Sequence, residues 1–296
     1  MSGTAAKCMF RPLITVDELL SAQARAEQAQ DAQILLVDCR HDLMKPEAGK
    51  QAYLQGHLPG AIHLSLDTDL ADHAAGLCGG RHPLPARERL RARLEAIGLS
   101  EQTHLVAYDS DGGSFAARLW WLTQWLGHER VSVLDGGLPA WLGAGLAMTT
   151  EIPLPTPGKL RLRTPLVAWV DVDTVADDVA QDRRVVLDAR APVRFSGSQE
   201  PLDPVAGHIP GALNRFWQAN LAANGCFHST DQLRAEFLSL LKGRPADAVI
   251  HQCGSGVTAC HNLLAMAHAG LSGALLYAGS WSEWCSDPSR PVATGG

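Results

Sequence analysis

The sequence lacks the features that mark membrane, secreted and nucleic-acid-binding proteins. No apolar run approaches the ~18–20 residues of a membrane-spanning helix. Residues 1–11 contain no apolar core of signal-peptide length. The net charge is −6 and no basic run stands out, which argues against binding to nucleic acid. We therefore expect a cytoplasmic protein that binds neither membranes nor nucleic acid.

Cysteine is present, but not in a pattern typical of disulfide or zinc frameworks. The seven cysteines lie at positions 8, 39, 78, 226, 253, 260 and 285. They form no Cys-x-x-Cys pair, and the sequence has no His/Cys cluster at zinc-ligand spacing. An odd, dispersed set in a chain of this size favours reduced thiols over disulfides. We expect no metal and no cofactor.

The chain of 296 residues contains an internal repeat, and its length suits two domains of about 150 residues each. An apolar run ends in Asp-x-Arg at Asp38 and again at Asp188, an offset of 150 residues. A Gly-His-apolar-Pro-Gly-Ala turn starts at Gly56 and again at Gly207, an offset of 151 residues. Landmarks that recur in the same order at one period indicate a duplicated domain.

Each half alternates short apolar strands with helical patterns. The helices are expected over residues 87–98, 114–127, 231–241 and 257–269, and a capping box at Thr15 to Glu18 precedes another helix. Such alternation predicts an α/β fold, with a mostly parallel sheet flanked by helices in each half. Residues 151–158 hold three prolines and a glycine and predict a stiff connector. We expect domains at residues 1–152 and 160–296.

The most informative stretch surrounds Cys253. An apolar run, Val249-Ile250, ends in His-Gln-Cys, and two glycines, Gly254 and Gly256, precede a helical pattern. We interpret this as a strand, a tight loop and a helix, with the glycines letting successive amides curl toward one point. Curled amides at a helix N-terminus bind anions and favour a thiolate over a thiol. The pattern predicts a nucleophilic cysteine, and a buried structural cysteine is the alternative.

The two halves differ at this position. The first half carries Asp109 where the second carries Cys253, and its loop contains Asp111 and no cysteine. A carboxylate there is expected to repel the anions that the other half attracts. We therefore expect a catalytically silent first domain that walls the site of the second.

Other residues of the second half are placed to face the cysteine. Ser255 lies in the loop and is a candidate donor to a bound anion, with loop stabilisation as the alternative. Thr258 opens the helix and is expected to bond its own backbone. Arg194 lies a few residues past a strand end and is a candidate partner for a substrate carboxylate. His57 and His208 occupy the repeated turns and suggest a shared structural role, one of them also reaching the cleft.

These motifs together resemble the two-domain rhodanese-type sulfurtransferases over nearly the whole chain. The resemblance rests on the Asp-x-Arg strand ends, the two Gly-His turns and the segment 279–284, Gly-Ser-Trp-Ser-Glu-Trp. The active-site loop, Cys253, Gly254, Ser255, Gly256, Val257 and Thr258, is similar to the 3-mercaptopyruvate sulfurtransferase version. Thiosulfate-using members typically have two cationic residues directly after the cysteine, where this chain has a glycine and a serine.

The resemblance implies sulfur transfer in two steps. Cys253 takes sulfane sulfur from 3-mercaptopyruvate as a persulfide and passes it to cyanide or to a thiol acceptor such as thioredoxin or glutathione. The resemblance also implies that Ser255 acts near the donor, that Arg194 binds its anionic group and that His57 assists from the first domain. Two domains that share one site in one chain fit a monomer.

One feature departs from the mercaptopyruvate pattern. Those enzymes usually carry a second arginine about nine residues after the one matching Arg194, and residues 195–203 contain none. Arg215 follows a neighbouring turn and is a candidate substitute. The missing arginine keeps open thiosulfate:cyanide sulfur transfer as an alternative.

Two further classes remain alternatives. Dual-specificity phosphatases share this fold, but their loop needs an arginine to hold phosphate, and residues 253–260 contain none. A non-catalytic rhodanese-like module tends to lose its cysteine, whereas this chain keeps Cys253 and both loop glycines.

Overall fold

The structure, a computed structural model, describes residues 10–29 and 33–295, so Cys8 lies outside the described part. Its first half contains β1 (Leu13–Ile14), α1 (Val16–Ala29), β2 (Ile34–Asp38), α2 (Glu47–Gln55), β3 (Ile62–His63), α3 (Arg87–Ala96), β4 (His104–Tyr108), α4 (Ala116–Trp125), β5 (Val131–Leu134) and α5 (Gly137–Gly143). Its second half contains β6 (Ala168–Val170), α6 (Val172–Ala180), β7 (Val185–Asp188), α7 (Pro192–Phe195), β8 (Leu213–Asn214), η1 (Trp217–Asn220), α8 (Thr230–Leu241), η2 (Ala246–Ala248), β9 (Val249–Gln252), α9 (Ala259–His268), β10 (Leu275–Tyr277) and α10 (Ser280–Trp284). The helices expected from the sequence are present, with ends that shift by up to two residues.

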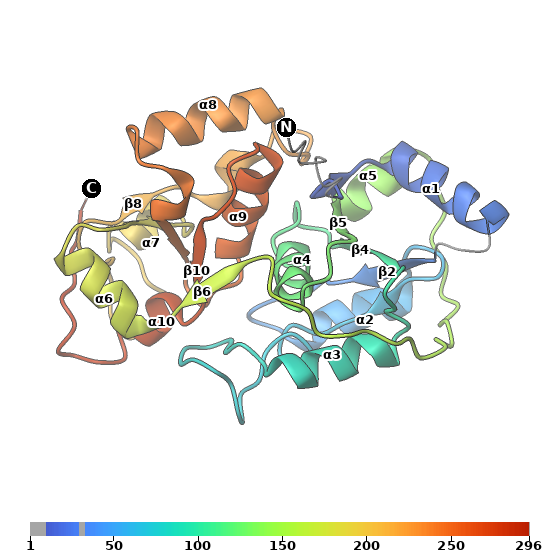
Figure 1. The fold of residues 1–296 in the computed structure, drawn as a ribbon, viewed down its shortest axis with the longest axis horizontal. Coiled ribbons are helices and arrows are strands. Elements are labelled where there is room, and N and C mark those ends of the chain that lie inside the picture. The colour runs from blue at the N-terminus through green and yellow to red at the C-terminus, as the bar shows by residue number, and fades with distance from the viewer. Residues whose placement is uncertain (1–9, 30–32, 296) are drawn as a thin grey trace, which may run out of the picture.

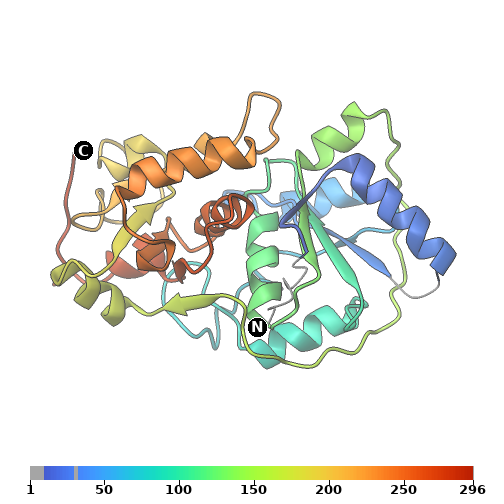
Figure 2. The same cartoon turned by 45° about the horizontal axis from the view of Figure 1, so that its top comes forward.

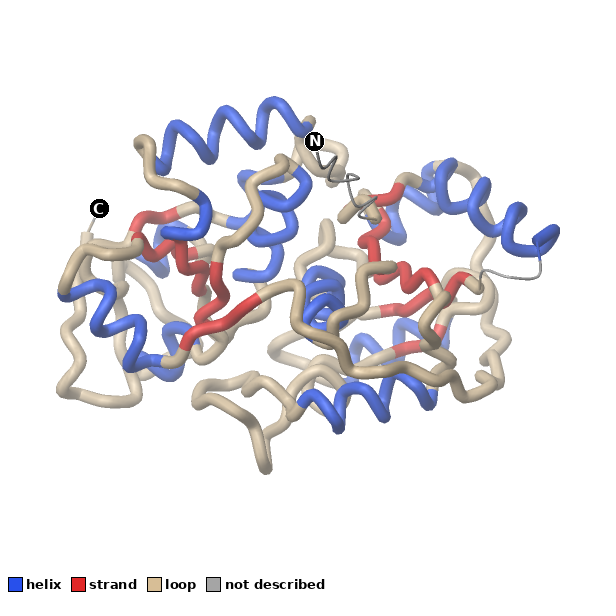
Figure 3. The backbone as a smooth tube through the Cα atoms, viewed as in Figure 1, coloured by secondary structure: helices blue, strands red, loops and turns tan. Residues whose placement is uncertain are grey.

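Each half forms one five-stranded sheet, and the two sheets have the same strand order. The orders are β1-β5-β4-β2-β3 and β6-β10-β9-β7-β8, and the neighbouring strands pair in parallel. Figure 3 shows the strands of each half enclosed by helices and loops. Asp38 pairs with Tyr108 in one sheet, and Asp188 pairs with Gln252 in the other. The duplication and the parallel α/β architecture expected from the sequence are therefore confirmed.

Three apolar clusters form the core, and one of them joins the two halves. One cluster spans both halves and contains residues of α3, α4, α8 and α9, while the outer faces of the two sheets have clusters of their own. Helices α4 and α9 pack against each other between the sheets (Figure 1). The interface between the halves is thus continuous with the core, and burial of apolar surface stabilises it.

The connector runs along the first half before it enters β6 (Figure 2). The amide of Gly158 donates to the carbonyl of Glu95 at 2.7 Å, and the amide of Leu166 donates to the carbonyl of Gln124 at 3.1 Å. These bonds fix the extended, proline-rich segment on the first half. The connector is therefore an ordered segment attached to the first half.

The repeated Gly-His turns have the structural role expected of them. His57 and His208 each form an antiparallel bridge with a segment near the end of their half, at Thr149 and Ala293. Each imidazole also bonds a backbone carbonyl through Nδ1, at 2.8 Å and 2.7 Å. The capping box at Thr15 is formed as well, with the Thr15 amide donating to the Glu18 carboxylate at 2.9 Å.

In the part of the chain that the structure describes, no helix has the length and apolar composition needed to cross a membrane.

Candidate active site

Cys253 lies where β9 ends and the loop toward α9 begins. Only 2% of its surface is exposed. Its amide donates to the Ser280 hydroxyl at 3.1 Å, and its carbonyl accepts from the Trp281 amide at 3.0 Å. The Ser282 amide donates to the Gly254 carbonyl at 2.9 Å. The start of α10 therefore fixes the outer side of the loop and its carbonyls.

The amides of the loop remain available. Among the described residues, no hydrogen-bond acceptor is recorded for the backbone N–H groups of residues 254–259. Gly256 has φ +74°, and a Cβ there would lie 2.3 Å from the carbonyl oxygen of Ala278. Position 256 thus requires a glycine, both for the left-handed backbone and for the close approach to the Ala278 carbonyl. A run of unpaired amides before a helix N-terminus is suited to a bound anion.

Gly254 serves a different purpose from the one expected. Its backbone is outside the left-handed region, but a Cβ at this position would lie 2.8 Å from Nη2 of Arg81. The glycine therefore leaves space for a guanidinium group that reaches the loop from the first half.

Ser255 is connected to a histidine and a carboxylate of the first half. Its Oγ lies 2.7 Å from Nδ1 of His82, and Nε2 of His82 lies 3.2 Å from Oδ1 of Asp67. Because the carboxylate only accepts, Nε2 carries the proton of the neutral ring and Nδ1 accepts from the Ser255 hydroxyl. Burial lowers the pKa of His82, so the ring is neutral at neutral pH. Its hydrogen bond lowers the pKa of the Asp67 carboxyl, which keeps it ionised.

A cavity of about 750 Å³ opens above the loop, between the halves. Cys253, Gly254, Ser255, Val257 and Thr258 line its floor. The first half contributes residues 41–43, Arg81 and residues of the 111–115 segment, and the second half contributes residues of the 190–194 and 216–225 segments and Leu202. The site is therefore complete only with both halves. Thr258 makes no side-chain cap bond to α9, contrary to expectation.

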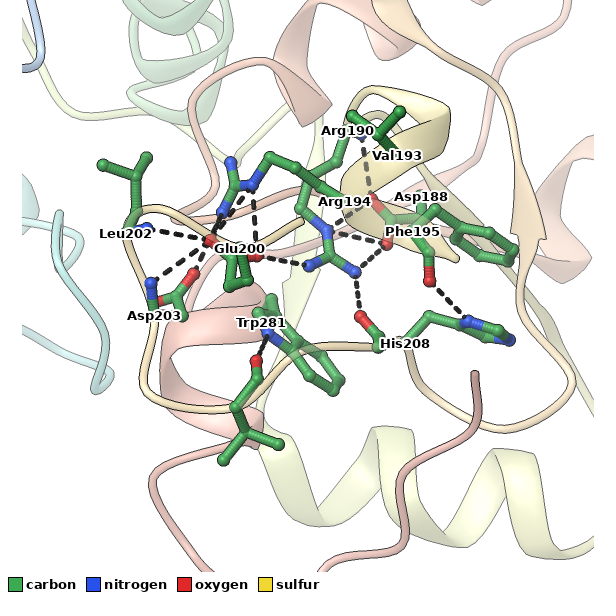
Figure 4. A network of polar contacts seen from close by, with 12 residues as sticks. Asp188, Arg190, Val193, Arg194, Phe195, Glu200, Leu202, Asp203, His208 and Trp281 are labelled. Atoms are coloured by element: carbon green, nitrogen blue, oxygen red, sulfur yellow. Dashed lines mark hydrogen bonds and ion pairs between the residues drawn. The ribbon is translucent and has the colours of Figure 1, made fainter. Parts of the chain in front are cut away.

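Arg194 lines the cavity as expected, but it is not free (Figure 4). Its guanidinium donates to Oε1 of Glu200 at 2.7 Å and to Oδ2 of Asp203 at 3.1 Å. The resemblance leads one to expect a second arginine at position 203. The residue there is Asp203, and its carboxylate pairs with Arg194. Arg190 is a structural ion pair with Asp188 at 2.6 Å.

The structure corrects two of the expected donor-binding residues. His57 is fully buried, stacks on Tyr53 and has both ring nitrogens against the backbone carbonyls of Tyr53 and Glu151, so it does not line the cavity. Arg215 pairs with Glu236 at 2.6 Å and lies over the ring of Phe237, also away from the cavity. In both cases a local polar partner uses the side chain.

Four residues of the first half that form the network at this site were not identified from the sequence: Asp67, Arg81, His82 and Arg118. His82 and Arg81 follow a Gly-Gly pair, and this concentration of polar residues after a flexible turn is the signal that could have found them. Arg118 of α4 is fully buried, and it donates to the carbonyls of Gly256 at 3.0 Å and His82 at 3.1 Å. It joins the loop and the histidine segment in one network.

Asp109 occupies the equivalent loop of the first half. Its carboxylate accepts from the amides of Asp111, Gly113, Phe115 and Ala116 at 2.8–2.9 Å. The expectation that this carboxylate repels bound anions is therefore incomplete. The carboxylate itself is the anion that fills the loop, so no space for another one remains there.

Comparisons with known proteins agree with this architecture. The model of the rhodanese-like domain matches residues 18–144 and 171–287. The chain is 46% identical over 279 residues to a probable 3-mercaptopyruvate sulfurtransferase of Pseudomonas aeruginosa, covering 94% of this chain and 98% of the relative. It is 42% identical over 288 residues to a Mycobacterium tuberculosis protein provisionally named thiosulfate sulfurtransferase SseB, covering 96% and 97%.

A solved structure agrees as well. The crystal structure of the Escherichia coli 3-mercaptopyruvate sulfurtransferase SseA has a TM-score of 0.75 and 32% identity, covering 93% of this chain and all of the other. The paired sheets, the cysteine loop and the two matched segments lead to one conclusion: the chain belongs to the rhodanese family, with two rhodanese-like domains in tandem.

Proposed function

We propose that the chain is a sulfurtransferase that moves sulfane sulfur from 3-mercaptopyruvate to a thiol or cyanide acceptor through a persulfide on Cys253. The observation that carries this proposal is the loop itself. A buried cysteine precedes a run of backbone amides that have no acceptor in the described part of the chain, at the floor of a cavity between the halves. Such a loop stabilises a negative charge on sulfur, both as thiolate and as persulfide.

In the first step the Cys253 thiolate attacks the donor sulfur. The carbon–sulfur bond breaks, and its electron pair stays on the carbon as the enolate of pyruvate. The proton of the donor thiol ends on that carbon, which leaves pyruvate and a persulfide anion. Ser255, hydrogen-bonded to His82, is the group that relays this proton, and Asp67 holds the imidazole in the tautomer that accepts it.

In the second step the acceptor attacks the terminal sulfur. The sulfur–sulfur bond breaks and its electron pair returns to Cys253, so the thiolate is restored. Cyanide then leaves as thiocyanate, and a thiol leaves as a persulfide. The cavity volume of about 750 Å³ is in the range of small-molecule sites, which supports glutathione or cyanide as acceptor, and a cysteine of a protein such as thioredoxin is the alternative.

The experiment that tests the chemistry is incubation of the purified chain with 3-mercaptopyruvate, followed by mass spectrometry. We expect a gain of one sulfur atom on the peptide that contains Cys253, and its loss on addition of cyanide. A chain that gains no sulfur from 3-mercaptopyruvate or thiosulfate would instead be a non-catalytic rhodanese-like module.

Thiosulfate is the second candidate donor. The Mycobacterium tuberculosis relative provisionally carries that name, and the second arginine expected of mercaptopyruvate enzymes is absent at position 203. The neutral Gly254 and Ser255 favour 3-mercaptopyruvate. Steady-state assays with both donors and cyanide decide between them, and a higher kcat/KM with thiosulfate would overturn the preferred donor.

We also propose the division of labour between the domains. Residues 1–152 form the catalytically silent domain, with Asp109 in place of a cysteine, and residues 160–296 form the catalytic domain. One chain supplies both walls of the cavity, so a cytoplasmic monomer is sufficient for activity. Light scattering of the active protein tests this, because a chain active only as a dimer would contradict it.

A further inference from the structure

A loop of the first half places an arginine beside the cysteine loop of the second. The Gly79 amide donates to Glu283 at 2.6 Å, and the Arg81 amide donates to the Ser282 hydroxyl at 3.1 Å. A Cβ at Gly80 would lie 2.5 Å from the carbonyl oxygen of Gly279, so the two backbones are in close contact. Figure 1 shows this loop, in cyan before α3, extending toward α10. Arg81 is therefore held in position by its own backbone.

Arg81 and Arg194 share one carboxylate. Nη1 of Arg81 pairs with Oδ1 of Asp203, and Nη2 of Arg194 lies 3.1 Å from Oδ2 of the same residue. The side chain of Asp203 is only 3% exposed, so the carboxylate of this bridge is shielded from water, while the Arg81 side chain is 31% exposed. One carboxylate between two guanidinium groups, with one oxygen to each, is the arrangement in which arginines also bind the carboxylate of a small acid.

The two guanidinium groups meet at the cysteine loop. A Cβ at Gly254 would lie 2.8 Å from Nη2 of Arg81 and 3.4 Å from Nη1 of Arg194. Both arginines line the cavity that contains Cys253. The loop itself is neutral after the cysteine, but two cations from outside the loop lie next to it.

We propose that Arg81 and Arg194 together bind the carboxylate of a small mercapto acid, and that Asp203 occupies their shared face until the donor displaces it. This inference rests on the proposed sulfur-transfer function and names the residues that select its donor. Glu200 remains on Arg194 during the exchange, because it accepts from both Nε and Nη2. The exchange keeps one carboxylate on the guanidinium pair, so neither arginine is left as a buried unpaired charge.

The Asp203 carboxylate therefore competes with the donor carboxylate for the guanidinium groups of Arg81 and Arg194. Without its negative charge, the Arg81–Arg194 pair would lack one counter-charge in a shielded place and would attract an anion more strongly. A neutral asparagine side chain at this position has the same shape, but it cannot pair with two guanidinium groups as a carboxylate does. Removing the charge at position 203 and removing the charge at position 81 should thus change donor binding in opposite directions.

The test separates binding from chemistry by using pyruvate as an inert carboxylate. Calorimetric titration of pyruvate into the full chain with Cys253→Ala is compared with the same chain carrying Arg81→Gln, Arg81→Lys or Asp203→Asn. We expect Arg81→Gln to weaken pyruvate binding roughly 10- to 100-fold, with Arg81→Lys in between. We expect Asp203→Asn to strengthen it several-fold. Unchanged affinity in Arg81→Gln, or weaker binding in Asp203→Asn, would overturn the proposal.

Two controls exclude a purely structural effect. Methyl pyruvate carries no charge, so its binding should not change in Arg81→Gln, and an equal loss for both ligands would overturn the proposal. Arg244→Gln removes a more exposed pair with Asp182 in the second half and should leave pyruvate binding unchanged.

Steady-state turnover of 3-mercaptopyruvate, measured in the chain that retains Cys253, distinguishes the proposed sulfur-transfer function from the proposed role of Arg81. A raised KM with kcat nearly unchanged in Arg81→Gln supports both. A chain without turnover whose pyruvate binding depends on Arg81 refutes only the sulfur-transfer function. Normal turnover with an unchanged KM in Arg81→Gln refutes only the role of Arg81.

Discussion

The two halves contain the same amide loop in two states. In the first half the carboxylate of Asp109 accepts four backbone amides, from residues 111, 113, 115 and 116. In the second half the amides of residues 254–259 have no recorded acceptor among the described residues, and Cys253 stands at the position of Asp109. Each loop is also held by the helix that follows the next strand: the Leu138 amide of α5 donates to the Asp109 carbonyl, and the Trp281 amide of α10 donates to the Cys253 carbonyl.

This difference teaches what the loop is for. A buried carboxylate is tolerated in the first half because four amides satisfy its oxygens. The corresponding amides of the second half are available to an anion, and in the proposed reaction that anion is the thiolate or persulfide of Cys253. The first domain thus preserves the fold of an anion site with the anion built in, and the second domain keeps the site available.

The largest expected effect comes from making the second loop like the first. In Cys253→Asp the new carboxylate should accept the loop amides, so all sulfur loading from either donor is lost while the fold remains intact. Mass spectrometry after donor treatment and thermal unfolding measure both. The comparison fails if Cys253→Asp unfolds several degrees below Cys253→Ala, a shift that corresponds to about 1 kcal/mol or more.

The next effect compares two buried histidines of the first half. His82→Gln removes the acceptor of the Ser255 proton and should lower kcat roughly 100- to 10,000-fold. His57→Gln disrupts two contacts to backbone carbonyls and should cost about 1–3 kcal/mol of unfolding free energy with little change in kcat. Steady-state kinetics and denaturant unfolding of both variants provide the measurement. An equal loss of kcat in the two would show that His82 acts only through stability.

The pH profile sharpens the same comparison. Burial lowers the pKa of His82 below its ordinary value of 6.5, so its protonation, and with it the loss of the Ser255 acceptor, occurs only at more acid pH. We expect kcat to be level at neutral pH and to fall on an acid limb whose midpoint lies below 6.5. The limb should disappear in His82→Gln. A limb that persists in that variant would belong to another group.

The smallest effect on activity is expected in the silent loop. Asp109→Asn places an amide NH2 group against backbone N–H donors, and should lower the unfolding free energy by about 2–4 kcal/mol. Sulfur loading of Cys253 should remain near the wild-type level in the folded protein. Urea unfolding and sulfur loading from the donor test this. Loss of sulfur loading in Asp109→Asn protein that is still fully folded would give the first loop a direct role in the chemistry.

Much of the fold could be predicted from the sequence because its signals are local. Strands β4, β5 and β9 coincide with apolar runs in the sequence, and the Thr15 capping box marks the start of α1. The repeat predicted a duplicated domain, and the identical strand order of the two sheets agrees with it. Cys253 was identifiable because a cysteine between a strand and a glycine-containing helix start is typical of a thiolate that backbone amides stabilise.

The donor-binding residues were harder to predict, since an arginine or histidine has many possible partners. His57 and Arg215 carry suitable chemistry, yet Tyr53, Glu151 and Glu236 use their polar atoms. His57 lies in a repeated turn and His82 follows a Gly-Gly pair, but neither pattern shows which ring reaches the cysteine loop. Only the folded chain shows that His82 contacts Ser255 and that His57 does not.

The sequence by itself determined the duplication, the parallel α/β architecture, the inequality of the two loops and the position of Cys253. Tertiary structure alone decided which first-half groups complete the site, namely Asp67, Arg81, His82 and Arg118. The physical reason is distance along the chain. Strand, loop and helix signals depend on neighbours within a few residues, whereas Ser255 and His82 are 173 residues apart and meet only when α4 packs against α9.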